Sequence, residues 1–211
     1  MKPSCIPHAL AGGAVAGLGS TRVRRLGTLG LTLFLLLNLS LLAALNAPGV
    51  IDEDDTRFEL VGQGAFRWKR LIHAYDACFH AGKDSAPATF LAGAPIRLEI
   101  HYRRGFSAAD IISGGDALLR RNVSAETLKS LQDRLAKLNQ AYVDVKAGDR
   151  YTLTYVPAKG TTLRLNGTPL VTVEGADFAA AYFRIWLGED PISPSLRDLL
   201  LGKGNPSAPT P

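Results

Sequence analysis

The residue types that most often bind transition metals gather on one segment of this sequence. Asp76, Cys78 and His80 alternate along a predicted strand and therefore share one of its faces, while His73 and His101 are further candidate ligands. Successive side chains on one strand face lie about 6.6 to 6.8 Å apart, so three of them do not converge on one ion without help from another element. We therefore expect no metal and no cofactor, and Cys78 is expected to pack in the interior.

Motifs of nucleophilic and phosphate chemistry are absent from the sequence. Ser193 and Ser195 belong to no nucleophile elbow, and no G-x-S-x-G, phosphate-binding loop or H-E-x-x-H motif occurs. Aromatic residues are a candidate stacking surface, but at strand and helix spacing they are more typical of a core. The residues expected to be core on this ground are Trp68, Tyr182, Phe183 and Trp186.

Several strands are predicted from the alternation of apolar and polar residues. Apolar and polar residues alternate over residues 96–103 and again over 151–155, which predicts strands with one buried and one solvated face. Residues 163–173 contain Asn166-Gly167 between apolar runs, the pattern of a hairpin with a type I′ turn. One-sided strands of this kind indicate an antiparallel sheet.

Four helices are predicted from capping residues and apolar stripes. Ser107 with Asp110 forms a capping box for a short helix that ends near Gly114-Gly115, and Ser124 begins a longer one with a leucine stripe. The third follows Asp177 and ends at Gly188, and the last begins at Ser193-Pro194 and runs through Leu201. Blocks of strands and helices in this order predict the α+β class, with helices covering one sheet face.

The N-terminal part reads as a membrane-targeting segment. Residues 26–45 carry no charge over a length that is enough helix to cross a bilayer. Arginines precede it at 22, 24 and 25 and an acidic run follows at 52–55, so the positive-inside rule places the rest of the chain on the non-cytoplasmic side. An uncleaved anchor is favoured over a cleaved signal peptide, because the apolar stretch exceeds the usual seven to fifteen or so residues.

These signals divide the chain into a disordered basic lead (1–25), an anchor or signal segment (26–45), a polar linker (46–57), one folded domain (58–202) and a disordered tail (203–211). The net charge of +5 comes mostly from the lead: removing its four basic residues from 24 leaves 20 against 19 acidic residues. Such a balance offers no surface for nucleic acid. Cys5 and Cys78 lie on opposite sides of the apolar segment, so no disulfide forms within the domain.

Four stretches of the domain resemble the chalcone isomerase-like family, in particular its bacterial exported branch. They are LVGQGAFRWKRLIHAYDACFHAG, PIRLEIHYRRGFS, LRLNGTPL and, most specific, FAAAYFRIWLGEDPISPSLRDLLLG. The resemblance implies an open-faced β-sandwich in which a large antiparallel sheet is backed by helices, with a ligand cleft between them whose floor Trp186 would form. In that branch the non-cytoplasmic side is the periplasm, into which cleavage of the signal would release the domain.

The resemblance also identifies where catalytic side chains would lie. The family uses an arginine, threonines, a tyrosine and an asparagine, and Arg67 is the nearest match to the arginine, shifted by one residue. Such a shift reverses the strand face unless a bulge intervenes. The positions of the tyrosine, the asparagine and two threonines carry altered side chains: Ile111, Leu118, Ile185, and Arg70 or Leu71.

Chalcone isomerisation is therefore not expected, because alkyl side chains do not stabilise an enolate and one lost oxyanion donor costs about a hundredfold to a thousandfold in rate. The sequence favours a membrane-tethered, non-catalytic domain that binds a small apolar or fatty-acid-like ligand, with Arg67 and Tyr75 as carboxylate anchor and Ile111, Leu118 and Ile185 lining the cleft. The simpler interpretation makes Arg67 a solvent-facing strand residue and Tyr75 a packing residue. The alternative functions are an isomerase or lyase for another substrate and a partner-binding module without a pocket; no particular protein partner is indicated.

Overall fold

The computed structural model describes residues 48–69 and 71–203, and within them every strand belongs to one seven-stranded antiparallel sheet. Neighbours in the sheet are also neighbours in the sequence, in the order β1 to β7. The strands are β1 (Val50–Glu53), β2 (Thr56–Trp68), β3 (Ile72–Gly82), β4 (Ile96–Tyr102), β5 (Arg150–Val156), β6 (Gly160–Leu165) and β7 (Thr168–Val173). The predicted α+β class and antiparallel sheet are confirmed.

The two faces of the sheet differ as the alternation of residues requires. Phe79, Leu98, Leu153 and Leu163 pair across four strands, and each is at most 2% exposed. This inner face holds the core, because in-register side chains on one face of a sheet pack against one another and against whatever covers them. The outer face carries polar side chains instead, including a row of His80, Arg97 and Thr154.

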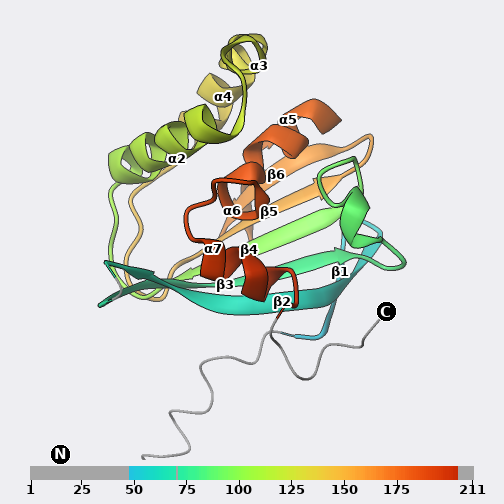
Figure 1. Ribbon diagram of the computed structural model, residues 1–211, viewed down its shortest axis with the longest axis horizontal. Helices are drawn as coiled ribbons and strands as arrows, with labels where there is room; N and C mark the ends of the chain where they lie inside the picture. The colour runs from blue at the N-terminus through green and yellow to red at the C-terminus, as the bar shows by residue number, and fades with distance from the viewer. Residues whose placement is uncertain (1–47, 70, 204–211) are drawn as a thin grey trace, which may run out of the picture. The chain divides into compact units, whose positions relative to one another are not determined.

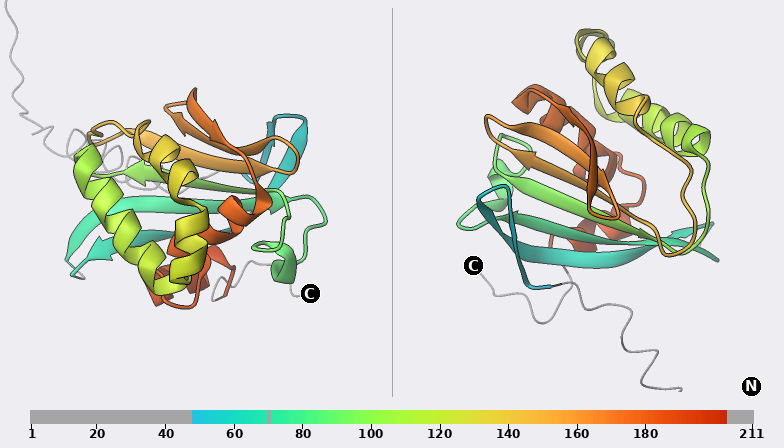
Figure 2. Two further views of the ribbon diagram at one scale, coloured as in Figure 1. Left: turned by 90° about the horizontal axis from the view of Figure 1, so that it is seen from above. Right: turned by 180° about the vertical axis from the view of Figure 1, so that it is seen from behind.

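The helices lie together over the inner face, and the sheet curls around them (Figure 1, Figure 2). A short 3₁₀ helix, η1 (Pro87–Thr89), interrupts the connection from β3 to β4. The helices are α2 (Ala108–Asn122), α3 (Ala125–Ser130), α4 (Gln132–Asn139), α5 (Ala176–Tyr182), α6 (Arg184–Leu187) and α7 (Pro194–Leu200).

The helix starts predicted from the sequence are confirmed, but several ends differ. Ser107 and Asp110 form the reciprocal capping box of α2, and Ser193 caps α7. However, α2 continues through Gly114-Gly115 to Asn122, because Leu118 and Leu119 beyond the glycines are buried in the core. Burial of apolar surface outweighs the cost of about 1 kcal/mol for a glycine within a helix.

Two predicted single helices are each divided in the structure. The segment after Ser124 forms α3 and α4, and the segment that ends at Gly188 forms α5 and α6. The hairpin between β6 and β7 follows the prediction, since Asn166 and Gly167 have φ of 51° and 86°. A type I′ turn requires positive φ at both central residues, which asparagine and glycine adopt most readily.

Two glycines of β2 allow α7 to pack directly against the strand. A Cβ at Gly62 would lie 2.1 Å from the carbonyl oxygen of Leu199, so only glycine permits this approach of the two backbones. A Cβ at Gly64 would lie 2.9 Å from the Leu199 side chain, which would have to shift. The G-x-G pattern thereby positions α7 against β2 beside the core.

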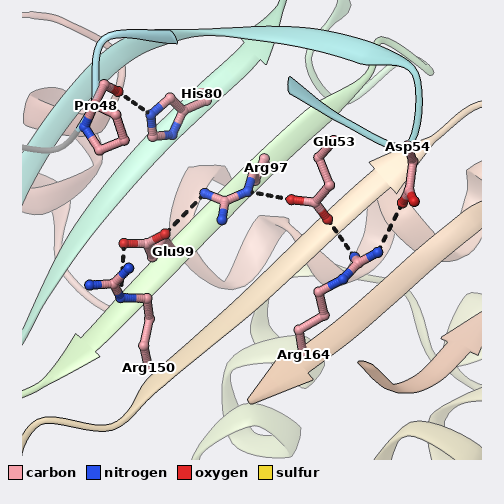
Figure 3. Close-up of polar contacts among 8 residues, drawn as sticks. All are labelled: Pro48, Glu53, Asp54, His80, Arg97, Glu99, Arg150 and Arg164. Carbon is pink, nitrogen blue, oxygen red and sulfur yellow. Dashed lines mark hydrogen bonds and ion pairs between the residues drawn. The ribbon is translucent and has the colours of Figure 1, made fainter. Parts of the chain in front are cut away.

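The segment predicted as a linker, residues 46–57, instead contributes β1 and the beginning of β2. The turn of this hairpin lies over the outer face of β4 and β6, where Glu53 pairs with Arg97 at 2.8 Å and with Arg164 (Figure 3). The ion pairs continue in both directions as an alternating series: Arg150, Glu99, Arg97, Glu53, Arg164 and Asp54. The linker prediction was wrong because these partners lie on strands far away in the sequence.

The predicted lead, anchor or signal segment and tail cannot be compared with the structure. Residues 1–47 and 204–211 lie outside the described residues, as does Arg70. Among the helices of the part that is described, none combines the length and the hydrophobicity that a membrane crossing requires.

Candidate functional site

The inner face of the sheet and the helices enclose an apolar cavity of about 150 Å³. Side chains from β2 to β5 form one wall, and residues of α2, α5 and α6 form the other. The most exposed lining residues are Asp110 and Gly114 on α2, and Phe66 and Phe106 are half-buried. The mouth of the cavity therefore lies beside the first half of α2.

The cavity wall carries tyrosine hydroxyls in an otherwise apolar surface. The Tyr75 hydroxyl accepts a hydrogen bond from Nε1 of Trp186 at 3.3 Å, which leaves its own hydrogen available to a ligand. The hydroxyls of Tyr142 and Tyr182 lie 2.8 Å apart, so whichever donates leaves the other hydrogen for a further acceptor. Tyr102 is also part of this wall and is 6% exposed.

The fifth tyrosine of the wall, Tyr151, has a structural role. Its hydroxyl donates to the carbonyl of Val143 at 3.0 Å and accepts from the amide of the same residue at 2.9 Å. These two bonds hold the loop before β5 against the sheet. Tyr151 therefore contributes its ring to the wall, whereas Tyr75 and the Tyr142–Tyr182 pair each keep one hydroxyl hydrogen that these bonds do not use.

Burial keeps these phenols neutral. Desolvation is the largest cause that raises the pKa of Tyr75, Tyr142 and Tyr182, and it acts in the same direction on the pKa of Tyr102. A phenolate in an apolar environment loses the hydration that stabilises its charge, so the protonated form is favoured. The tyrosines are therefore hydrogen-bond donors and not bases at physiological pH.

The raised pKa values predict a loss of stability in alkali. A tyrosine whose pKa is higher in the folded state contributes stability that is fully present below its ordinary pKa of 10.0 and is lost as the pH rises above it. We expect the free energy of unfolding to be constant from neutral pH to about 9 and to fall steadily above 10, as measured by urea unfolding alongside phenolate absorbance. Phenolate absorbance that rises with an ordinary midpoint while the domain stays folded would contradict this.

Four of the five residues predicted to bind the ligand line the cavity. They are Tyr75, Ile111, Leu118 and Ile185, and ligand contact at each of them stays a prediction. Arg67 does not line the cavity: it is exposed near the end of β2, just after a bulge at Phe66. In the register of the sheet it lies opposite His73 on β3. Leu71, a candidate threonine position, is 85% exposed.

The structure shows cavity residues that sequence reasoning did not assign to the site. Tyr102 and Tyr151 were recognised as inward-facing strand residues, and Tyr182 was assigned to the core. The spacing of these residues predicts a buried face, but it does not predict that a cavity lies next to their side chains. Trp186 does line the cavity, as predicted.

The distribution of charge around the cavity restricts what it can bind. Among its described lining residues there is no lysine, arginine or histidine, and the one carboxylate, Asp110, belongs to the capping box of α2 at the mouth. An anionic group inside would lose its hydration without gaining a cation. The interior is thus suited to an uncharged apolar group that offers a hydrogen-bond acceptor to the phenols.

The residues considered as metal ligands have other partners on the outer face. Asp76 binds His73 at 2.7 Å and pairs with Arg103, and His80 lies 3.1 Å from the carbonyl oxygen of Pro48 (Figure 3). In the described residues no group of three or more potential ligands is arranged to hold an ion. Burial raises the pKa of the Cys78 thiol to about 11, so this thiol is a poor nucleophile.

Comparisons with known proteins agree on the fold. A model of the chalcone isomerase-like family matches residues 42–202. The structure is similar to that of a fatty-acid binding protein of Arabidopsis thaliana, with a TM-score of 0.53 and 13% sequence identity, over 72% of this chain and 96% of that one. At this identity the similarity shows the fold alone. No curated protein sequence matches the chain significantly.

Proposed function

The chain belongs to the chalcone isomerase-like family, and we propose that its domain is a non-catalytic binding protein for a small apolar ligand held between the sheet and the helices. The observation that carries the proposal is the cavity itself, whose apolar wall presents neutral phenol donors and, among its described residues, no cation. A cavity of this kind binds by burying apolar surface and orients the ligand through a few hydrogen bonds.

The fold supports the same interpretation. The similar structure from Arabidopsis is a fatty-acid binding protein, so this architecture accommodates an apolar ligand in at least one other chain. A ligand carboxylate held by Arg67, as the sequence led us to expect, is not part of the proposal, because Arg67 lies outside the cavity. Tyr75 remains as an anchor, and its free hydroxyl hydrogen suits a carbonyl, ether or protonated carboxyl oxygen.

The volume of the cavity limits the part of the ligand that it encloses. A water-sized group occupies about 30 Å³ in the liquid, so about 150 Å³ holds roughly five such groups. This is enough for one aromatic ring or a short stretch of alkyl chain. A longer ligand would extend through the mouth beside Asp110 and Gly114.

The wall offers little for the isomerisation that gives the family its name. Closure of a phenolate on an enone requires a cation near the phenolate and donors for the enolate, and donors alone are present among the described lining residues. Their raised pKa values also make them poor general bases at neutral pH. These features favour binding over catalysis.

Native mass spectrometry of the protein purified from its source cells in a mild detergent tests the proposal. We expect a small molecule to travel with the folded chain and to be released on unfolding, because an apolar cavity is seldom left empty when an apolar ligand is available. A folded chain that carries no small molecule, and that takes up none from an apolar ligand library, would contradict the proposal.

We further propose that residues 26–45 tether the domain on the non-cytoplasmic, periplasmic side of the membrane. Support comes from the uncharged length of this segment and from the arginines that precede it. Protease added to intact spheroplasts should digest the domain and leave a membrane-bound N-terminal fragment. Digestion only after the membrane is lysed would contradict this topology.

A further inference from the structure

Among the large apolar side chains that the structure describes, the two most exposed lie at the turn between β2 and β3. Trp68 is 50% exposed and Leu71 is 85% exposed. This corrects the expectation that Trp68 belongs to the core. We call Arg67, Trp68, Lys69 and Leu71 the β2–β3 tip; Arg70 lies outside the described residues and is not part of it.

Positive charge surrounds these apolar side chains. Within the tip, Arg67 and Lys69 flank Trp68, and Nζ of Lys69 lies 4.5 Å from the centre of the Trp68 ring. The tip contains no acidic residue. An exposed tryptophan and leucine beside two basic residues is the combination found where proteins meet the lipid–water interface.

A second basic turn lies beside the tip. The amide of Arg103 donates to the carbonyl of Ala74 at 2.9 Å, which places the end of β4 next to the beginning of β3. Arg104 follows and lies over the ring of Phe106. Figure 1 and Figure 2 show the β2–β3 turn and the chain that enters α2 at the same end of the sheet. Arg103 pairs with Asp76, so Arg104 is the residue that extends the positive charge from the tip to this second turn.

We propose that the β2–β3 tip docks into the interface of an anionic lipid bilayer, with Trp68 and Leu71 among the headgroups and acyl chain ends and the basic residues on the lipid phosphates. Each basic residue near an anionic surface strengthens binding by about 1 kcal/mol, which is about fivefold. A protein partner is a poorer match, because a stable protein interface engages about 20 to 30 residues on each side and the tip has four described residues.

Docking in this orientation brings the mouth of the cavity near the membrane. Phe66, which directly precedes the tip, and Phe106, which packs under Arg104, both line the cavity. An apolar ligand would then pass between bilayer and cavity without crossing water. Only this consequence rests on the proposed function; the docking itself rests on the tip.

The test uses fluorescence of the full chain reconstituted into vesicles whose acyl chains carry bromine, which quenches tryptophan at short range. The chain has two tryptophans, and Trp186 is buried, so Trp68→Phe gives the internal baseline. We expect quenching that depends on Trp68 in phosphatidylglycerol vesicles, and that is weaker in pure phosphatidylcholine vesicles and at high salt. Equal quenching of the wild type and Trp68→Phe, or equal quenching in both lipids, would overturn the proposal.

Matched variants locate the effect. Lys69→Gln removes a charge that is attracted to the anionic lipid, and Leu71→Ser removes an apolar side chain that would be buried in the bilayer. Each variant should lower the Trp68-dependent quenching roughly fivefold. Leu170→Ser removes a leucine that is 37% exposed on β7, at the opposite edge of the sheet, and should leave the quenching unchanged. An equal loss in Leu170→Ser, or shielding of Trp68 that appears only when another protein is added, would refute lipid docking.

Discussion

Gly115→Leu should abolish ligand binding while the domain stays folded. A Cβ at Gly115 would lie 3.8 Å from the Tyr182 hydroxyl and 3.9 Å from Cδ1 of Ile185, so a side chain here enters the cavity at ordinary contact distance. The four side-chain carbons of leucine, at about 30 Å³ for each water-sized group, would fill most of the 150 Å³. We expect the affinity to fall at least about a hundredfold, which is about 2.7 kcal/mol.

Stability should change little in the same variant. Leucine is favoured over glycine by up to about 1 kcal/mol within a helix, which offsets the strain of a tightly filled cavity. The measurements are native mass spectrometry for the bound molecule and urea unfolding for the fold. Ser113→Leu is the matched control, because it adds the same side chain to an exposed position of α2 that does not line the cavity.

Each outcome of this pair is informative. Loss of the ligand in Gly115→Leu alone places it between α2 and the sheet. A ligand retained at full occupancy in Gly115→Leu, or lost equally in Ser113→Leu, would show that binding does not use this cavity.

Glu53→Ala should cause a large loss of stability. The Glu53 carboxylate lies between the guanidinium groups of Arg97 and Arg164, and all three side chains are no more than 16% exposed. Removing one partner from a buried ion pair costs about 3–5 kcal/mol, because the remaining charge is left without compensation. Arg97 keeps Glu99 and Arg164 keeps Asp54, so we expect the lower end of this range.

Thermal unfolding measures this effect, with an expected fall in Tm of roughly 6–12 °C for a domain of this size. Asp55→Asn is the control: Asp55 lies in the β1–β2 turn and pairs with Lys159, but its side chain is 99% exposed, and asparagine tolerates the positive φ of 62° at this position, so no measurable change is expected. If Glu53→Ala and Asp55→Asn have the same Tm, the ion pairs of the hairpin do not hold it against the sheet.

The elements that the sequence predicts best are those whose causes are local. The capping box of Ser107 and Asp110, the Ser193 cap and the Asn166-Gly167 turn each depend on residues within a few positions of one another. The strands over 96–102 and 151–155 were likewise predictable, because consecutive residues of a strand point to opposite faces and the sequence alternates accordingly.

The errors arise where a distant partner decides the outcome. Residues 50–57 have a polar composition typical of a linker, yet they join the sheet because Arg97 and Arg164 compensate their carboxylates. Gly114 and Gly115 resemble a helix end, yet α2 passes through them because Leu118 and Leu119 are buried beyond. Trp68 has the spacing of a core residue, but it lies where β2 ends and the helices no longer cover the sheet.

By itself the sequence determined the α+β class and the antiparallel sheet, because periodicity, caps and turns act over short distances. The resemblance of four segments to the chalcone isomerase-like family added the family and four of the residues that line the cavity. Only the tertiary structure decided the character of the site. Whether Tyr102, Tyr142 and Tyr182 fill the core or border a cavity depends on the distance between α2 and the sheet, and that distance is set by the packing of many side chains at once. The register shift between Phe66 and Arg67 was likewise not readable from residue type, and beyond it Arg67 is exposed and lies outside the cavity.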